Sequence, residues 1–158
     1  MSEYPSNDFN KETADAVYFY TPRFYPLDNF SAFVVQLWGK EFRTAEHAYQ
    51  WKKYIDSYPD IAQQIFDATS PNAAIKIANE NKDKVTKEWH DTKVAIMEDI
   101  LIAKIEQHEK IRMVLLETER RTIIENSPID SFWGTGPDGT GNNELGKLYM
   151  KLRQRLVQ

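Results

Sequence analysis

A chain of 158 residues with 41% hydrophobic residues is long enough to bury one substantial core. It contains no cysteine, which excludes disulfides, thiolate nucleophiles and cysteine-ligated zinc. Its formal net charge of −4 argues against sequence-independent binding along duplex nucleic acid and favours a small or local partner.

No stretch is apolar enough to span a membrane or resembles a secretory leader, so we predict a cytoplasmic protein without membrane contact. His47, His90 and His108 are too far apart in sequence for a local metal cluster, and we predict neither a metal nor a cofactor. No linker or repeat divides the chain. We therefore predict a flexible end over residues 1–14 and one domain over residues 15–158, with the oligomeric state left open.

The first elements in chain order are predicted to be short strands. Residues 16–21, AVYFYT, have the aromatic and β-branched composition of a strand. Residues 32–38 and 41–44 are predicted to form a hairpin that turns at Gly39–Lys40, because glycine can adopt a positive φ there. This β element is small and lies near the N-terminus.

From Thr44 onward, apolar spacing predicts helices. Thr44 and Ser70 are candidate N-caps, and Pro71 suits the first position of a helix. The predicted helices are residues 45–57, 59–68, 71–81, 87–107, 108–118 and about 143–156. Residues 122–126 form either a short strand or a turn. The sequence thus predicts a mainly α fold with a small β element.

Residues 132–143, FWGTGPDGTGNN, contain four of the six glycines and include a GxGxxG spacing. A dinucleotide-binding turn needs a second strand beyond its helix, and the 19 residues after Gly139 leave no room for one. A Walker loop is excluded because Leu148 stands where that motif needs serine or threonine. Two interpretations remain. The segment is either a surface turn with Trp133 as a core anchor or a ligand-contacting loop with an anion site at the helix start near Asn143.

A polar stripe is predicted on the helix that follows Thr44. Glu46, Gln50 and Lys53 stand at i, i+4 and i+7, so they share one face over about 10 Å of helix. A carboxylate, an amide and an amine in this arrangement could hold and protonate a polar ligand. The alternative is an ordinary solvated face. His47 points about 100° away and is more often structural than catalytic in such a position.

Two further residues have a structural and a functional interpretation. Trp89 begins the longest predicted helix and is either a core residue or a stacking surface. Asp130 precedes the glycine-rich loop and is either a turn former or a second carboxylate at its entrance.

Together, these residues resemble the NADAR superfamily of YbiA-like N-glycosidases. The resemblance covers about residues 17–156, and its most specific part is DSFWGTGPDGTGNNELGKLYMKLR, residues 130–153. Supporting matches are YFY at 18–20, FSAF at 30–33, Glu46–His47 with Gln50 and Lys53, Ser70–Pro71, Trp89, and AKxEQHxxxR at 103–112.

The resemblance implies a YbiA-like helical domain that hydrolyses N-glycosidic bonds. One implied activity releases ribose 5-phosphate from early riboflavin-pathway intermediates. The alternative removes ADP-ribose from guanine in nucleic acid or nucleotides, and this is the only way in which nucleic acid would be a partner. A third hypothesis is a non-enzymatic interaction module, which would expose Phe132 and Trp133 on a flat patch.

We predict three catalytic residues and seven that bind the substrate. The catalytic residues are Glu46, Asp130 and Lys53, and the substrate-binding residues are Trp89, Trp133, Gly134, Gly136, Asn143, His47 and Gln50. Cleavage of a C1′–N bond builds positive charge on the sugar, so the Glu46 carboxylate would stabilise the transition state or activate water. The two tryptophans would stack on the base, and Lys53 could attack C1′ and form a Schiff base.

The chain departs from the family pattern at several places. These are Ala32 for the asparagine of FSNF, Ala45 for serine, Trp51 and Tyr54 within the QAxKF segment, and Ala78–Asn79 for Gly-Arg. The last change removes a basic residue that could meet a phosphate group. We therefore expect the reaction class to follow the family more closely than the substrate does.

Overall fold

The computed structural model of the chain describes residues 11–19 and 23–158. Contacts between Cα atoms divide the chain into two compact units. One unit combines Met1–Asp28 with His108–Gln158, and the other is Asn29–Gln107. Six α-helices among the described residues confirm the mainly α class.

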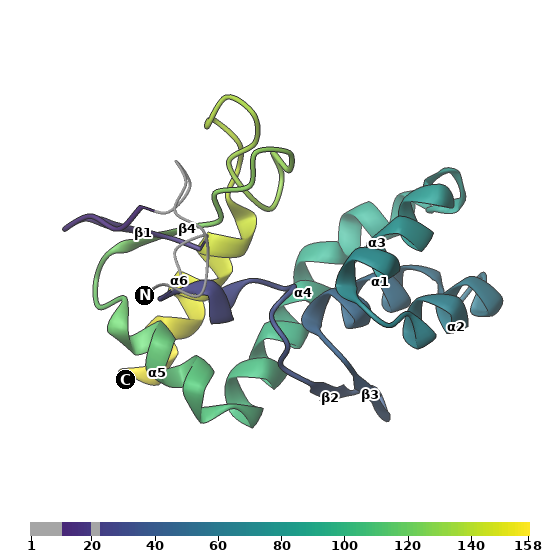
Figure 1. The fold of residues 1–158 in the computed structure, drawn as a ribbon, viewed down its shortest axis with the longest axis horizontal. Coiled ribbons are helices and arrows are strands. Elements are labelled where there is room, and N and C mark those ends of the chain that lie inside the picture. The colour runs from purple at the N-terminus through teal and green to yellow at the C-terminus, as the bar shows by residue number, and fades with distance from the viewer. Residues whose placement is uncertain (1–10, 20–22) are drawn as a thin grey trace. The chain divides into compact units, whose positions relative to one another are not determined.

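The unit Asn29–Gln107 is a hairpin followed by four helices (Figure 1). Its elements are β2 Val35–Leu37, β3 Lys40–Phe42, α1 Ala45–Tyr54, α2 Pro59–Asp67, α3 Pro71–Glu80, a 3-10 turn at Lys82–Lys84, and α4 Lys87–Gln107. Helices α1, α2 and α3 pack on one another, and α1 also packs on α4. Helix α4 has the predicted bounds.

Both predicted side-chain caps in this unit are confirmed. The Thr44 hydroxyl accepts a hydrogen bond from the His47 amide at 3.2 Å, and the Ser70 hydroxyl accepts one from the Ala73 amide at 3.1 Å. Helix α1 ends at Tyr54, three residues before its predicted end. The caps therefore fix where α1 and α3 begin, and α1 begins one residue before Glu46.

The predicted hairpin is present, but its turn lies one residue earlier than predicted. Trp38 and Gly39 both have positive φ, 53° and 74°, and Leu37 pairs with Lys40 across the turn. A two-residue turn with two positive φ angles matches the right-handed twist of the strands. Trp38 takes a positive φ although it is not glycine. The prediction places Gly39 first in the turn for this reason, and the turn Gly39–Lys40 is wrong by one residue.

The second unit joins the two ends of the chain. Its elements are β1 Ala16–Tyr18, a 3-10 turn at Tyr25–Leu27, α5 Glu109–Glu117, β4 Thr122–Ile124 and α6 Glu144–Leu156. Strand β1 pairs in parallel with β4, with Val17 opposite Ile123. The β structure is therefore not confined to the N-terminal part of the sequence, because the ambiguous segment 122–126 supplies a strand. Residues 20 and 21 of the predicted first strand lie outside the described residues.

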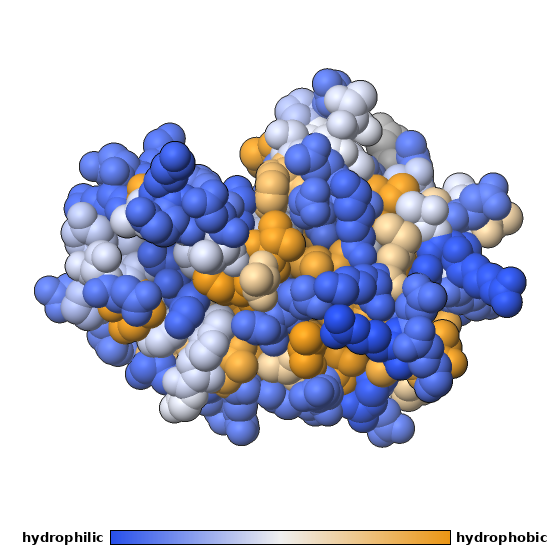
Figure 2. Space-filling view, turned by 180° about the vertical axis from the view of Figure 1, so that it is seen from behind, coloured by the Kyte–Doolittle hydropathy of each residue, from blue (hydrophilic) through white to orange (hydrophobic). Residues whose placement is uncertain are grey.

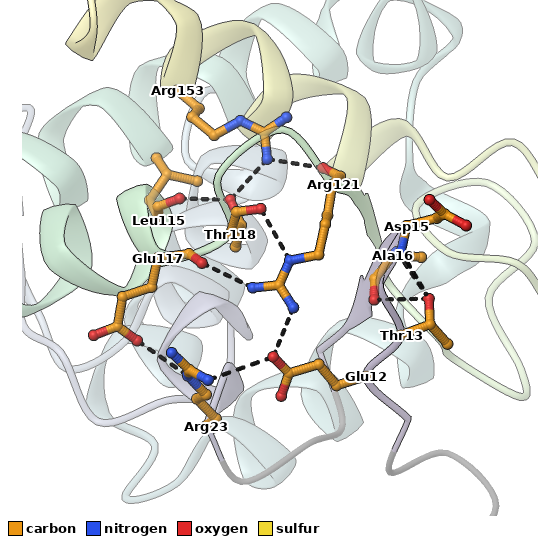
Figure 3. A network of polar contacts seen from close by, with 10 residues as sticks. All are labelled: Glu12, Thr13, Asp15, Ala16, Arg23, Leu115, Glu117, Thr118, Arg121 and Arg153. Atoms are coloured by element: carbon orange, nitrogen blue, oxygen red, sulfur yellow. Dashed lines mark hydrogen bonds and ion pairs between the residues drawn. The ribbon is translucent and has the colours of Figure 1, made fainter.

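A network of arginines holds the start of the described chain in this unit (Figure 3). Arg121 pairs with Glu12 at 2.6 Å, and Arg23 pairs with Glu117 at 3.2 Å. Arg153 donates to the Thr118 hydroxyl at 2.7 Å. Residues 1–10 of the predicted flexible end lie outside the described residues. Glu12, within the described remainder, is held by this ion pair and by a β-bridge to Val17.

No helix in the described ranges is long and apolar enough to cross a membrane. Hydrophilic residues occupy most of the face shown in Figure 2, with smaller hydrophobic areas between them.

Candidate active site

The predicted polar stripe on α1 is present in the unit Asn29–Gln107. Glu46, the second residue of α1, is only 6% exposed, and Gln50 is 4% exposed. The Gln50 side-chain amide donates a hydrogen bond to Glu46 Oε1 at 2.8 Å. This bond fixes the orientation of the carboxylate, and the burial excludes the solvated-face alternative for these two residues.

Lys53 lies one turn beyond Gln50 on the same face of α1, and Trp89 of α4 lies beside it. The Trp89 ring lies 5.2 Å from the Tyr49 ring, at an interplanar angle of 57°. The Lys53 ammonium lies 5.1 Å from the Tyr49 ring centre and 5.7 Å from that of Trp89. Aromatic faces attract a cation, so the two rings hold the lysine side chain at this end of the stripe. The unit thus brings together Glu46, Gln50, Lys53 and Trp89.

His47 has a structural role on the neighbouring face of α1. Its Nδ1 lies 2.8 Å from the Thr44 hydroxyl, and its Nε2 lies 2.9 Å from the Ala68 carbonyl. A carbonyl only accepts, so Nε2 carries the proton and Nδ1 accepts from the hydroxyl. Both ring nitrogens are therefore occupied by protein groups, which link α1 to the end of α2, and contact of His47 with substrate stays a prediction.

The burial of His47 makes the stability of the fold depend on pH. Burial lowers its pKa below the ordinary value of 6.5; the bond to Ala68 opposes this effect, and the nearby Arg43 charge adds to it. The unfolded chain therefore takes up a proton below pH 6.5 that the folded chain resists. We expect the free energy of unfolding to be highest above pH 6.5 and to fall by up to about 1.4 kcal/mol per pH unit below it.

Urea denaturation of wild type and H47Q at pH 7.5 and 5.5 measures this contribution. The variant should lose less stability than wild type between the two pH values. His90 is exposed on α4, and H90Q is the matched control that should behave as wild type. An equal loss in H47Q and wild type would show that His47 does not carry the effect.

In the other unit, Asp130 builds the entrance to the glycine-rich loop. Its Oδ1 accepts hydrogen bonds from the amides of Phe132 and Trp133, at 2.9 and 2.8 Å. The Ser127 hydroxyl accepts bonds from the amides of Ile129 and Asp130 in the same way. These contacts confirm the turn-forming interpretation of Asp130. A catalytic role for its carboxylate stays a prediction.

The backbone of the glycine-rich loop is closely packed against itself and against the preceding segment. A Cβ at position 134 would lie 2.7 Å from the Glu125 carbonyl oxygen, and one at position 141 would lie 2.6 Å from the Ser131 carbonyl oxygen. Gly136 has a φ of 72° and packs against Ser131. Contact of the chain with itself is enough to require small residues at these positions, and substrate binding by Gly134 and Gly136 stays a prediction.

Backbone amides at the start of α6, where an anion site is predicted, make hydrogen bonds within the protein. The amides of residues 143, 144 and 145 donate to the carbonyls of Gly134, Phe132 and Trp133. The Asn143 side chain binds the backbone of β4: its amide donates to the Ile123 carbonyl, and its oxygen accepts from the Glu125 amide. Asn143 therefore links the start of α6 to β4, and the amides of residues 143–145 are used by the loop. Contact of Asn143 with substrate stays a prediction.

Trp133 is 8% exposed and packs edge to face against Phe132, with ring centres 4.9 Å apart. A flat exposed patch of these two rings, as the interaction-module hypothesis requires, is absent from the described part of this unit. A hollow of about 560 Å³ lies on the loop, lined by Ser131, Phe132, Pro137, Asp138, Thr140, Gly141 and Asn142. None of the ten predicted site residues lines it.

Three residues of the unit Asn29–Gln107 are not among the predicted site residues: Tyr49, Lys104 and Asn29. Tyr49 stands at i+3 from Glu46, so helical spacing alone could have indicated it. Lys104 is fully buried among the apolar residues of α4 and donates to the Ser31 hydroxyl at 3.1 Å. A lysine at a core position of an apolar helix face could have indicated Lys104, because lysine is rarely buried without a partner. The Asn29 carbonyl accepts from the Glu46 amide at 3.1 Å, and only the tertiary fold reveals that contact.

No group of three or more histidine, aspartate or glutamate side chains in the described residues is arranged to hold a metal ion.

The family model described as the NADAR domain matches residues 9–157, which include parts of both units. The chain belongs to the NADAR domain family. Its predicted family resemblance is thereby confirmed.

Named relatives agree with the NADAR assignment. N-glycosidase YbiA of Escherichia coli is 34% identical over 131 residues, which cover 83% of this chain and 81% of YbiA. A riboflavin biosynthesis protein of Vibrio vulnificus is 31% identical over 144 residues, 90% of this chain but 39% of that protein. The NMR structure of E. coli YbiA matches the NADAR fold described here with a TM-score of 0.80 and 29% identity, over 99% of this chain and 94% of that one.

Proposed function

We propose that this protein hydrolyses the C1′–N bond of a phosphorylated ribosylamine, such as an early riboflavin-pathway intermediate, and releases ribose 5-phosphate. The reaction class, N-glycoside hydrolysis, follows from membership of the NADAR family and from the relatives named N-glycosidases. The Vibrio relative named for riboflavin biosynthesis supports the choice of substrate. The observation that carries the proposal is the buried Glu46 carboxylate, oriented by Gln50 on the face that also bears Lys53.

Glu46 has the chemistry that the bond cleavage requires. As the C1′–N bond lengthens, positive charge grows on C1′ and the ring oxygen of the sugar, and an anionic carboxylate stabilises it. Burial strengthens this electrostatic interaction because little water screens it. The hydrogen bond from Gln50 to Oε1 holds the carboxylate in place before the reaction, so little reorganisation is needed.

Lys53 offers a covalent route along the same face. Its neutral amine would attack C1′, and the base would leave with a proton from that amine. The C1′–O4′ bond would then open, with the remaining amine proton passing to O4′, and water would hydrolyse the resulting imine. Trp89 packs beside Lys53 and would present an aromatic surface to the departing base. In the alternative route, water attacks C1′ directly and Lys53 only contacts the substrate.

Borohydride trapping distinguishes the two routes. We expect borohydride, added during turnover, to reduce the imine and attach the sugar phosphate to Lys53, detectable by mass spectrometry of the tryptic peptides. The K53R variant keeps the charge but forms no such imine, so it should give no adduct. A wild-type enzyme that turns over substrate without any adduct would exclude the Schiff-base route and leave direct water attack.

The proposed substrate is tested by incubating the protein with a ribosylaminopyrimidine phosphate and, separately, with guanine-linked ADP-ribose. We expect sugar release from the first substrate at a much higher kcat/KM. Preferential release of ADP-ribose would instead support the alternative activity within the same reaction class. Release from neither would contradict the proposed function.

A further inference from the structure

Two buried side-chain oxygens beside Glu46 have no hydrogen-bond donor among the described residues: Asn29 Oδ1 and Gln50 Oε1. Asn29 is 8% exposed and Gln50 is 4% exposed. A buried acceptor without a donor costs free energy, so native proteins rarely keep one unless it has a role. Both oxygens belong to residues that hydrogen-bond to Glu46, the proposed catalytic carboxylate, and this points to a position where a ligand supplies the donors.

Both oxygens are held in place by contacts that involve Glu46. Gln50 must present its amide nitrogen to the acceptor Glu46 Oε1, so its own oxygen is directed away from that bond. The backbone carbonyl of Asn29 accepts from the Glu46 amide, which fixes Asn29 beside the first turn of α1. The Asn29 amide nitrogen lies 3.6 Å from the sulfur of Met97, a weak acceptor, and this leaves Oδ1 as the oxygen without a donor.

The hydrogen-bonding chemistry of the Asn29, Gln50 and Glu46 oxygens determines which ligand groups can bind to them. Two amide oxygens and a carboxylate all accept hydrogen bonds, so together they repel an anionic phosphate and attract neutral hydroxyl or amino groups. In the proposed reaction Glu46 lies close to C1′ of a ribose. The nearest donors on such a substrate are the hydroxyl groups on C2′, which is bonded to C1′, and on C3′. Hydrogen bonds to the 2-hydroxyl also strengthen as a glycosidic transition state forms.

We propose that Asn29, together with Gln50, binds the vicinal hydroxyl groups of the substrate's ribose and makes the enzyme selective for ribosyl over 2-deoxyribosyl compounds. This inference rests on the proposed function for the identity of the sugar. It adds Asn29 as a specificity-determining residue and gives Gln50 a second role besides orienting Glu46. The phosphate group binds elsewhere.

Calorimetric binding of ribose 5-phosphate and 2-deoxyribose 5-phosphate tests the inference without requiring turnover. Wild type should bind ribose 5-phosphate roughly ten-fold more tightly or better, because the deoxy sugar leaves a buried acceptor unpaired. The N29L variant has similar volume without polar atoms, and it should bind both sugars within about two-fold. N29D retains acceptor oxygens and should keep the preference. N81L makes the same change directly after α3 and should also keep it.

The melting temperature of N29L shows whether Asn29 binds the sugar or stabilises the fold. The N29L variant removes an acceptor without a donor, so its melting temperature should equal or exceed that of wild type. A lower melting temperature with unchanged sugar preference would overturn the inference, as would equal binding of both sugars by wild type or no binding of either. Hydrolysis of the ribosylaminopyrimidine phosphate is assayed separately, so its absence would reject the proposed function whatever the binding result.

Discussion

The E46Q variant should release sugar at least about 10³-fold more slowly than wild type while keeping its fold. The amide has almost the same shape as the carboxylate, and its oxygen can still accept the hydrogen bond from Gln50. It carries no negative charge, however, so it cannot balance the charge that grows on the sugar. A loss of about 4 kcal/mol of transition-state stabilisation corresponds to this factor.

The E46Q rate is measured as sugar release under saturating substrate, and folding is checked by thermal denaturation. Glu80 on α3 is exposed, and E80Q is the matched control that should retain full activity. Full activity of E46Q would reject Glu46 as the catalytic carboxylate. Unfolded E46Q would instead show that the carboxylate has a structural role.

The G141A variant should lose about 2–4 kcal/mol of folding free energy. An alanine Cβ would lie 2.6 Å from the carbonyl oxygens of both Gly134 and Ser131. These carbonyls accept hydrogen bonds from the amides of Asn143 and Asn142, so moving them would disturb the start of α6. Urea denaturation measures the change.

Gly139 in the same loop provides the matched control. Its φ is 77°, and nothing lies within 4 Å of a Cβ built there, so G139A should cost only the left-handed backbone penalty, about 1 kcal/mol. Equal losses in G139A and G141A would contradict the packed loop described here and would favour a mobile one.

Much of the helical architecture is predictable from the sequence because it depends on local chemistry. Thr44 and Ser70 cap helices that begin where predicted, and α4 has the predicted bounds. The parallel pairing of β1 with β4 is not predictable in this way. Its strands are three residues long and more than a hundred residues apart, and only the tertiary fold brings Val17 opposite Ile123.

The candidate site likewise has a part that is predictable from local sequence and a part that depends on the tertiary fold. Helical spacing predicts that Glu46, Gln50 and Lys53 share a face of α1, and the structure confirms it. The glycine-rich loop is different, because its composition suits both a ligand-binding loop and a self-packed one. The close approach of Gly134 to the Glu125 carbonyl shows that the loop is self-packed, and that contact depends on a segment outside the motif.

The most direct test of the catalytic assignment is the rate of ribose 5-phosphate release from a ribosylaminopyrimidine phosphate, compared with its spontaneous hydrolysis. Wild type should release one free base for each sugar phosphate at a rate far above the spontaneous one, and E46Q should remain near that background. Release by wild type that does not exceed the spontaneous rate, or equal release by wild type and E46Q, would contradict the assignment of N-glycosidase chemistry to Glu46.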